Sequence, residues 1–449
     1  MVCKQNVDKQ VLLWDSTLRR RTFNSNALLH VLIIAAGSNK LILKTHSLLE
    51  NKNLGSLEVF SILFNESINK VIYLLSLANN EKNQPSLESI TPFFELLLEN
   101  VFENTKYGLA HIQAELKSSA LSEAVIKSRT DLFNRVKISC KQWEINTCFV
   151  ISNFLNDRTL ISQKFFHNRK IGDIKLICDS KGDLHEKGLQ TLVLELTTGE
   201  RICFKPRSLK LENSFFNFLE TIGISNIYIA KFVEKDTYGW MEYIQHKQCD
   251  DIDGIKNYYH RCGLLLSVLY ALEAEDIHYE NMIAQGSHPV IVDLETLFHH
   301  GDDTCLHSHN QTMSLGKHTV LKTHFLPQFI NSDAKNEVSA IANNQLKSNR
   351  VTSVPFLNGE PVLIDNFIPN FIHGFTVGYE IILKKKKELL SKNSLLNIFV
   401  GSQFRYVPRS TNVYDKLIKA SQIPDFANSI YGESELRKKL FFYEWARCL

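Results

Sequence analysis

The sequence lacks the features that mark secreted, membrane-spanning or nucleic-acid-coating proteins. Its 9 cysteines are odd in number and form no Cys-x-x-Cys pair, which argues against a disulfide framework or a structural zinc site. The first ten residues are polar, and the apolar run at 27–36 is too short to cross a bilayer. The net charge is only +3, which argues against a nucleic-acid-binding surface. We therefore expect a cytoplasmic protein with no transmembrane segment and no nucleic-acid partner.

Glycine and proline are scarce in the first third of the chain. Apolar residues recur there at helical spacing from about residue 8 to 165, and the segment 121–160 predicts one or two long helices. At 449 residues the chain exceeds the size that one hydrophobic core usually organises, so two or three packed units are expected. The first predicted unit is an all-helical N-terminal region, residues 1–165.

The pattern changes after residue 166. Short β-rich runs at 174–177, 191–196 and 201–205 are separated by turns, and strands are also predicted at 227–233 and 240–244. Ser208 is a predicted N-cap for a helix at 209–219. Residues 166–246 thus predict a small antiparallel sheet with one helix. From 247 to 449 a long helix, two short strands at 281–284 and 290–293, and further helices follow, so the fold class is α+β.

Four residues of this β-to-α region have the order and spacing that phosphoryl transfer needs. Lys205 ends a predicted strand, Asp276 lies five residues before Asn281, and Asp293 follows a second apolar strand. Protein kinases use a strand lysine on the nucleotide phosphates, a catalytic Asp, and an Asn and a second Asp on magnesium. Each residue alone also fits a solvated lysine, a polar turn or a helix cap. The ordered set is much less probable by chance and predicts a kinase-like ATP site.

The chain departs from protein kinases at three places. His278 follows Asp276 instead of preceding it, Asp293 is followed by Leu294-Glu295 instead of Phe-Gly, and no G-x-G-x-x-G is present. The segment 182–188, with a glycine at each end, fits a turn over phosphates and equally a plain hairpin. Atypical and lipid-type kinases share the order Asp before His.

Five segments resemble the N-terminal dehydratase of class II lanthipeptide synthetases. They are 182–188 (GDLHEKG), 203–207 (CFKPR), 276–284 (DIHYENMIA), 292–296 (VDLET) and 405–411 (RYVPRST). The resemblance implies a lipid-kinase-like two-lobed fold, with 166–246 as the small lobe and 247–449 as the large lobe. It also implies that ATP phosphorylates Ser and Thr of a ribosomally made precursor peptide, after which phosphate is eliminated to give dehydroalanine and dehydrobutyrine.

The resemblance also assigns the residues of the kinase step. Lys205 would hold ATP phosphates and Asp183 would support the nucleotide site. Asp276 would orient or deprotonate the peptide hydroxyl, with His278 supporting its loop. The magnesium ligands would be Asn281 and Asp293, assisted by Glu295.

Arg405 and Thr411 match the pair that the family uses for elimination. A guanidinium suits this step because departing phosphate gathers negative charge, which paired N–H donors stabilise. Without the resemblance Arg405 reads as an ordinary strand arginine. The base that removes the α-proton is not identified by the sequence.

The family's chains usually continue into a zinc cyclase with a Cys-His-Gly segment, which this sequence lacks. We therefore expect a C-terminally truncated large lobe, and three explanations stay open: a gene fragment, a split enzyme that works with a separate cyclase, or one part of a larger chain. Two alternatives stay open: another kinase-like enzyme acting on a small molecule, or an inactive remnant that only binds peptide or a cyclase. A histidine- and acid-rich stretch at 299–309 lacks closed metal-ligand spacing and predicts a solvated loop.

Overall fold

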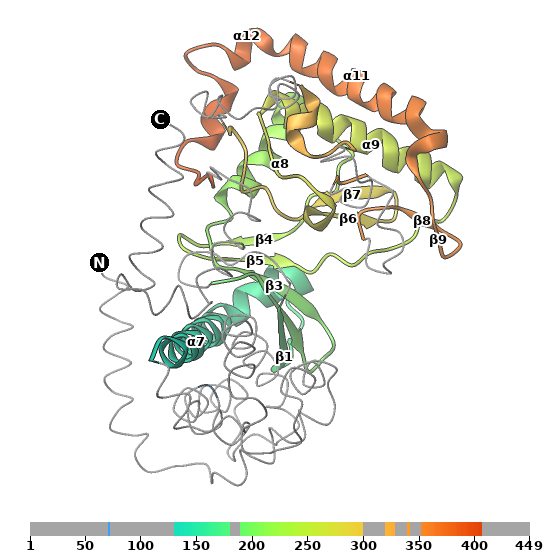
Figure 1. The fold of residues 1–449 in the computed structure, drawn as a ribbon. Helices are drawn as coiled ribbons and strands as arrows, with labels where there is room; N and C mark the ends of the chain where they lie inside the picture. The colour runs from blue at the N-terminus through green and yellow to red at the C-terminus, as the bar shows by residue number, and fades with distance from the viewer. Residues whose placement is uncertain are drawn as a thin grey trace, which may run out of the picture. The chain divides into compact units, whose positions relative to one another are not determined.

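The computed structural model describes residue 71 and the ranges 130–179, 189–299, 319–327, 339–341 and 352–405 (Figure 1). The described part mixes helices and strands, so the α+β prediction is confirmed. The contacts divide the described chain after Arg201 into a first and a second unit. The predicted lobes, with boundaries at 165/166 and 246/247, stay predictions. Within the described ranges, no helix has the length and apolar character that a bilayer crossing requires.

Helix α7, Thr130–Phe166, lies in the first unit and fulfils the prediction of a long helix. Its buried side chains include Trp143, Val150, Phe154 and Ile161, which recur every four or seven residues and form one stripe. Arg158 anchors the helix to the following chain through Asp173, at 2.7 Å, and through the carbonyl of Ile171, at 2.8 Å. The rest of the predicted helical region, apart from residue 71, lies outside the described residues.

The strands β1, Ile174–Asp179, and β2, Leu192–Leu196, pair antiparallel in the first unit. The leucines at 192, 194 and 196 are buried, and the residues between them are half-buried, which is the alternation of a strand with one core face. On the other face the carboxylate of Glu195 contacts Lys175 and Arg201, both at 2.8 Å. Hydrogen bonds from these two cations lower the pKa of Glu195.

The second unit contains an antiparallel set of strands with β5, Gly239–Glu242, between β3, Arg201–Lys205, and β4, Phe232–Glu234. The register of β3 and β5 places Lys205 opposite Gly239. The strand predicted at 227–233 is shorter than expected. The side chain of Glu242 accepts the N–H of Lys231 at 2.8 Å, so a carboxylate replaces the ladder acceptor and pairing begins at Phe232.

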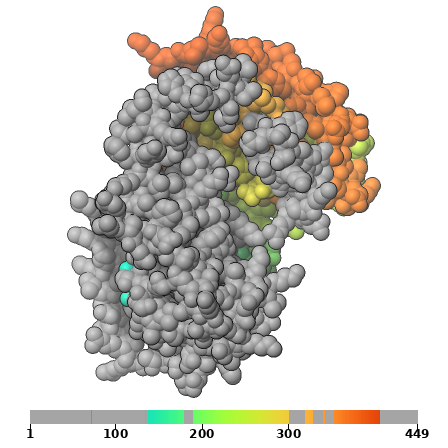
Figure 2. Space-filling model, in the orientation of Figure 1, coloured from blue at the N-terminus to red at the C-terminus, as the bar shows by residue number. Residues whose placement is uncertain are grey.

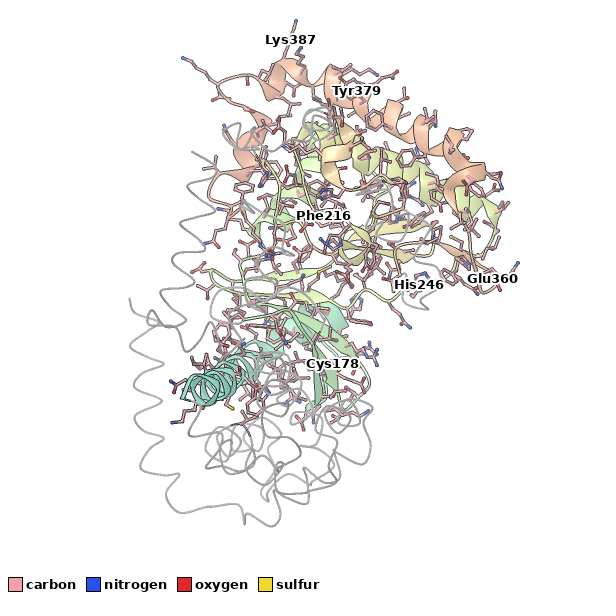
Figure 3. The ribbon with its side chains drawn as sticks, viewed as in Figure 1. Cys178, Phe216, His246, Glu360, Tyr379 and Lys387 are labelled. Atoms are coloured by element: carbon pink, nitrogen blue, oxygen red, sulfur yellow. The ribbon has the colours of Figure 1, made fainter. Side chains whose placement is uncertain are left out.

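Helix α8, Lys210–Ile222, follows β3 and buries most of its side chains. The predicted cap is wrong by one position. The helix begins from Leu209, and the Ser208 hydroxyl accepts the Lys210 N–H in a long bond of 3.3 Å. Gly223 ends the helix in the left-handed conformation, which glycine adopts without steric cost. Phe216 of this helix belongs to the buried core of the unit (Figure 3).

Helix α9, Ile252–Ala271, is the central helix of the second unit, and the Asp251 side chain caps it through the Gly254 N–H at 2.7 Å. Twelve of its side chains are buried. The hairpin of β6, Met282–Gln285, and β7, His288–Ile291, follows. It is displaced from the prediction, so that Asp293 lies two residues beyond β7 rather than at its end.

Helix α11, Ile368–Lys384, packs along α9, and the short helix α12, Lys386–Leu389, follows it (Figure 1). Both lie on a solvent-exposed rim, orange in the space-filling view, and Lys387 points away from it (Figures 2 and 3). The remaining short elements are β8, Phe356–Leu357; β9, Glu360–Pro361; and the 3-10 turns η2, Tyr279–Asn281; η4, Val320–Thr323; η6, Ile364–Phe367; and η7, Leu395–Phe399.

Candidate functional site

The loop that carries Asp276 follows α9 and is fixed by backbone hydrogen bonds. Glu275 and Thr296 bind each other twice: the Glu275 N–H donates to the Thr296 carbonyl at 3.0 Å, and the Thr296 hydroxyl donates to the Glu275 carbonyl at 2.5 Å. The Ile277 N–H donates to the Thr323 carbonyl at 2.9 Å. Asp276, between these anchors, has φ of 59°, a left-handed conformation that costs a non-glycine residue energy and persists because its neighbours hold it. The loop is therefore preset before any ligand binds.

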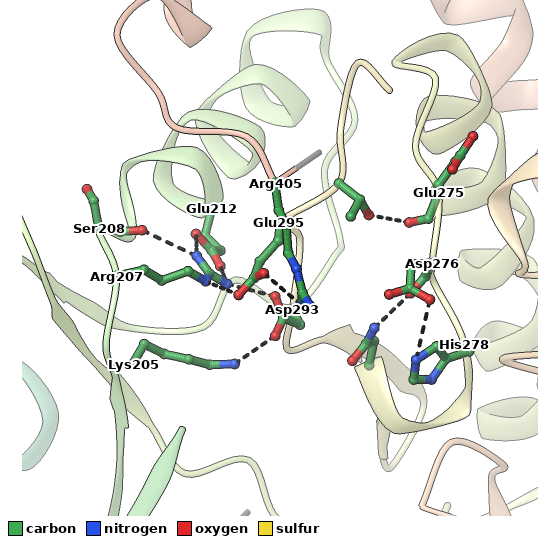
Figure 4. A network of polar contacts seen from close by, with 12 residues as sticks. Lys205, Arg207, Ser208, Glu212, Glu275, Asp276, His278, Asp293, Glu295 and Arg405 are labelled. Carbon is green, nitrogen blue, oxygen red and sulfur yellow. Dashed lines mark hydrogen bonds and ion pairs between the residues drawn. The ribbon is translucent and has the colours of Figure 1, made fainter. Parts of the chain in front are cut away.

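His278 contacts the side chain of Asp276, and Asn281 contacts its backbone carbonyl. The Asn281 amide donates to the Asp276 carbonyl at 2.7 Å. His278 Nδ1 accepts the N–H of Glu280 at 3.2 Å, which places the ring proton on Nε2, 3.6 Å from Asp276 Oδ1 (Figure 4). The Asp276 side chain is 43% exposed. The arrangement presents a carboxylate to solvent with its peptide and its side chain both restrained.

Asn281 also lies beside the segment that carries Asp293. The Val292 N–H donates to the Asn281 carbonyl at 2.9 Å, one residue before Asp293. The structure therefore brings together Asn281 and Asp293, which the sequence predicts as magnesium ligands. No three His, Cys, Asp or Glu side chains of the described ranges form a metal cluster. The predicted set contains the Asn281 amide, and as a metal site it stays a prediction.

Lys205 reaches across from β3 to the same carboxylate. Its ammonium lies 3.2 Å from Asp293 Oδ2, and its side chain is only 8% exposed. A buried charge is stable only with a partner of opposite sign. The pair joins residues 88 positions apart in the chain, so the fold, and not local sequence, creates it. The structure thus brings Lys205 and Asp293 together, and their roles at a nucleotide site stay a prediction.

Arg207 is the residue that sequence reasoning missed. It lies two positions after Lys205 and contacts three carboxylates: Glu212 at 2.5 Å, Asp293 at 2.7 Å and Glu295 at 2.5 Å (Figure 4). Burial by itself lowers the pKa of a guanidinium, but the charges of Glu212, Asp293 and Glu295 outweigh it, so the pKa of Arg207 stands well above its ordinary value. The only signal in the sequence was a second cation beside the candidate lysine, followed five residues later by an acid.

Glu295 links this cluster to Arg405. Its Oε2 lies 3.3 Å from Arg405 Nη1, and its backbone carbonyl accepts the Arg405 N–H at 2.8 Å. Glu295 Oε1 binds Arg207. The structure thus places Arg405 next to Glu295, and its role in elimination stays a prediction. Asp183 and Thr411 lie outside the described residues, and so does the histidine-rich stretch except His299, whose Nδ1 lies 3.0 Å from Glu275.

A second missed residue, His324, lies next to the Asp276 loop. It follows Thr323, whose carbonyl receives the Ile277 N–H, and has φ of 59°. Burial lowers the pKa of His324, while the charges of Asp276 and Glu275 act in the opposite direction. The residues around His324 follow no periodic pattern from which its position could be predicted.

The fold and the site define an α+β protein in which a buried strand lysine faces the carboxylate that follows a hairpin. The chain belongs to the DUF4135 family, described as a domain of unknown function, whose model matches residues 131–352 and 340–442. It is also 27% identical over 324 residues to the lacticin 481/lactococcin biosynthesis protein LcnDR2 of Lactococcus lactis subsp. lactis. That match covers 62% of this chain but only 34%, about a third, of the relative.

Proposed function

We propose that the chain is a lanthipeptide dehydratase of lipid-kinase-like fold, which phosphorylates Ser and Thr of a precursor peptide with ATP and then eliminates phosphate. The relative's name supports a role in the biosynthesis of a peptide of this kind. The observation that carries the proposal is the Lys205–Asp293 ion pair beside the Asp276–Asn281 loop. We propose the cytoplasm as its location and a ribosomally made precursor peptide as its substrate.

The residues present fit a magnesium nucleotide. Lys205 supplies a cation for phosphate oxygens, and Asp293 and Asn281 supply the carboxylate and amide oxygens that magnesium prefers. The amide nitrogen of Asn281 is used by the Asp276 carbonyl, which turns the amide so that its oxygen is the atom left for a metal. Bound magnesium would neutralise charge on the transferring phosphoryl group. The side chains that would hold it, Asp293 and Asn281, already lie on adjacent segments.

Asp276 is suited to receive the proton of the peptide hydroxyl. The hydroxyl oxygen forms a bond to the γ-phosphorus, the bond to the β-phosphate oxygen breaks, and the hydroxyl proton passes to Asp276. Its exposure leaves the carboxylate accessible to a peptide, and His278 restrains its orientation. Such a positioned base typically contributes about 10²–10⁴-fold to the rate.

Arg405 is suited to the elimination step. There the α-proton is removed, the bond between the β-carbon and the phosphate oxygen breaks, and phosphate leaves with that electron pair. A guanidinium stabilises the charge that gathers on the departing phosphate. The Arg405 side chain is a third exposed, and its Nη1 contacts the carboxylate of Glu295. Thr411 is proposed to assist from beyond the described residues.

The test is incubation with a precursor peptide and magnesium-ATP, followed by mass spectrometry. The protein should remove the mass of one water for each modified Ser or Thr. The variant Asp276→Asn should leave the peptide unchanged while still binding nucleotide. Asp253→Asn serves as the control, because Asp253 is a well-exposed carboxylate in the first turn of α9.

The other outcomes identify the alternatives. Phosphopeptide that accumulates without loss of water means a kinase without the lyase step, and Arg405→Ala should reproduce this state. Phosphorylation of a small molecule, unaffected by Arg405→Ala, means another phosphotransferase. No magnesium-dependent nucleotide binding in calorimetry refutes the enzyme proposal and leaves a binding remnant.

A further inference from the structure

Arg207 uses all three nitrogens of its guanidinium on carboxylates. Nη1 and Nη2 bind the two oxygens of Glu212 at 3.0 and 2.5 Å, Nη2 also binds Asp293 at 2.7 Å, and Nε binds Glu295 at 2.5 Å. We call Arg207, Glu212, Asp293 and Glu295 the Arg207 cluster. Glu212 lies in the first turn of α8, and Asp293 and Glu295 lie after β7. The cluster therefore ties a helix to the acidic segment of the site.

The contacts require an arginine. A guanidinium is a planar fork of five donors, whereas an ammonium directs three donors from one point and cannot match three carboxylates in different directions. The Arg207 side chain is 16% exposed and that of Glu212 only 3%. Water therefore cannot replace the lost contacts easily if Arg207 is shortened. Burial also makes this pairing weak evidence for stability alone, because desolvation offsets much of the attraction.

Two of the three carboxylates that Arg207 binds also contact a second cation. Asp293 faces Lys205, and Glu295 faces Arg405. We infer that Arg207 is a positioning residue that fixes Asp293 for the kinase step and Glu295, with Arg405, for the elimination step. This inference rests on the proposed function, and it assigns Glu295 to Arg405 rather than to magnesium.

The test uses Arg207→Lys, which keeps the charge and loses the fork. Its control is Arg158→Lys in the first unit, where the arginine contacts Asp173 and the Ile171 carbonyl through Nη2 alone. The double variant Arg207→Met with Glu212→Gln removes the charge pair together and guards against misfolding through an unpaired Glu212. All variants are first compared by melting temperature.

Two readouts separate positioning from a purely structural role. The first is the half-saturating magnesium concentration for binding of a non-hydrolysable ATP analogue. The second is the rate of phosphate elimination from a phosphoserine-containing precursor peptide. In Arg207→Lys we expect the first to rise and the second to fall by about 10-fold or more, the usual effect of losing a residue that orients ligands. Arg158→Lys should leave both readouts at the wild-type value.

Wild-type values in Arg207→Lys overturn the inference, and so does a loss confined to one of the two readouts. If the wild-type protein itself binds no magnesium nucleotide, the proposed function fails, and crystal structures of the wild type and Arg207→Lys still decide the positioning. Displacement of the Asp293 and Glu295 carboxylates from Lys205 and Arg405 supports it. Carboxylates that keep their places in the variant refute it.

Discussion

Replacing Gly374 of α11 by alanine tests the packing that positions the Asp276 loop. A Cβ atom on Gly374 would overlap the carbonyl oxygen of His260 and lie 2.8 Å from its carbonyl carbon. The reciprocal contact occurs at Gly263 of α9, where a Cβ would overlap the Phe371 carbonyl oxygen and lie 2.6 Å from the Phe375 nitrogen. The obstacles are backbone atoms on both sides, so no side-chain rotation relieves them. The helices must separate.

The sign of the stability change is the decisive quantity. In an open helix Gly→Ala raises the free energy of unfolding by about 1 kcal/mol. Overpacking a core costs about 1–3 kcal/mol, and the backbone obstacles place this site at the upper end. The difference predicts that Gly374→Ala lowers the free energy of unfolding by about 2 kcal/mol. The double variant with Gly263→Ala should lose less stability than the two single variants added together. Helices that one methyl group has already separated have room for the other.

Urea unfolding followed by circular dichroism measures these values. Thr376→Ala on the exposed side of α11 is the control, because it adds a better helix former without an obstacle. A gain in stability from Gly374→Ala, comparable with that of the control, would falsify the close crossing of α9 and α11. A fully additive double variant would contradict the shared separation.

Two further predictions concern buried cations and histidines. Arg261→Met removes the donors that reach the Asn226 carbonyl at 2.8 Å and the Ser287 carbonyl at 2.5 Å, so the free energy of unfolding in urea should fall by about 3 kcal/mol; a change under about 0.5 kcal/mol refutes the assigned contacts. Burial lowers the pKa of His260, His288 and His324, and His373 lowers that of His260 further. Below about 6.5, the pKa of an unfolded histidine, the unfolded chain therefore binds more protons than the folded protein. The free energy of unfolding should fall from pH 7 to pH 5, and a value that stays constant or rises contradicts the prediction.

The elements of the fold followed from the sequence where local chemistry decides them. The helix at α9 was predicted because its apolar residues repeat at helical spacing, and the structure adds that the Asp251 side chain caps it. β2 and β3 were predicted because a glycine turn separates two β-rich runs. The strand predicted at 227–233 begins too early, because the Glu242 side chain accepts the Lys231 N–H in place of a backbone carbonyl. A sequence pattern does not reveal this contact.

The site was predictable to the extent that spacing within one loop defines it. Asp276, His278 and Asn281 lie within six consecutive residues, and the structure links them by short contacts. The Lys205–Asp293 contact was predicted only through the order of elements, since 88 residues separate the two. The order of the elements does not reveal the contacts of Arg207. Its three partners come from a helix and from beyond a hairpin, and only the folded chain brings them to one guanidinium.

The charges of the site determine how a nucleotide must enter. Three cations, Lys205, Arg207 and Arg405, face three anions, Glu212, Asp293 and Glu295. Under the proposed function, Lys205 has to exchange Asp293 for phosphate oxygens, and Asp293 has to turn toward a metal. Arg207 would keep Glu295 through Nε and Glu212 through Nη1 and Nη2 during this exchange, because only the contact between Nη2 and Asp293 changes. Glu295 lies two residues after Asp293, so the guanidinium would hold this segment in place through Glu295 while the Asp293 carboxylate turns.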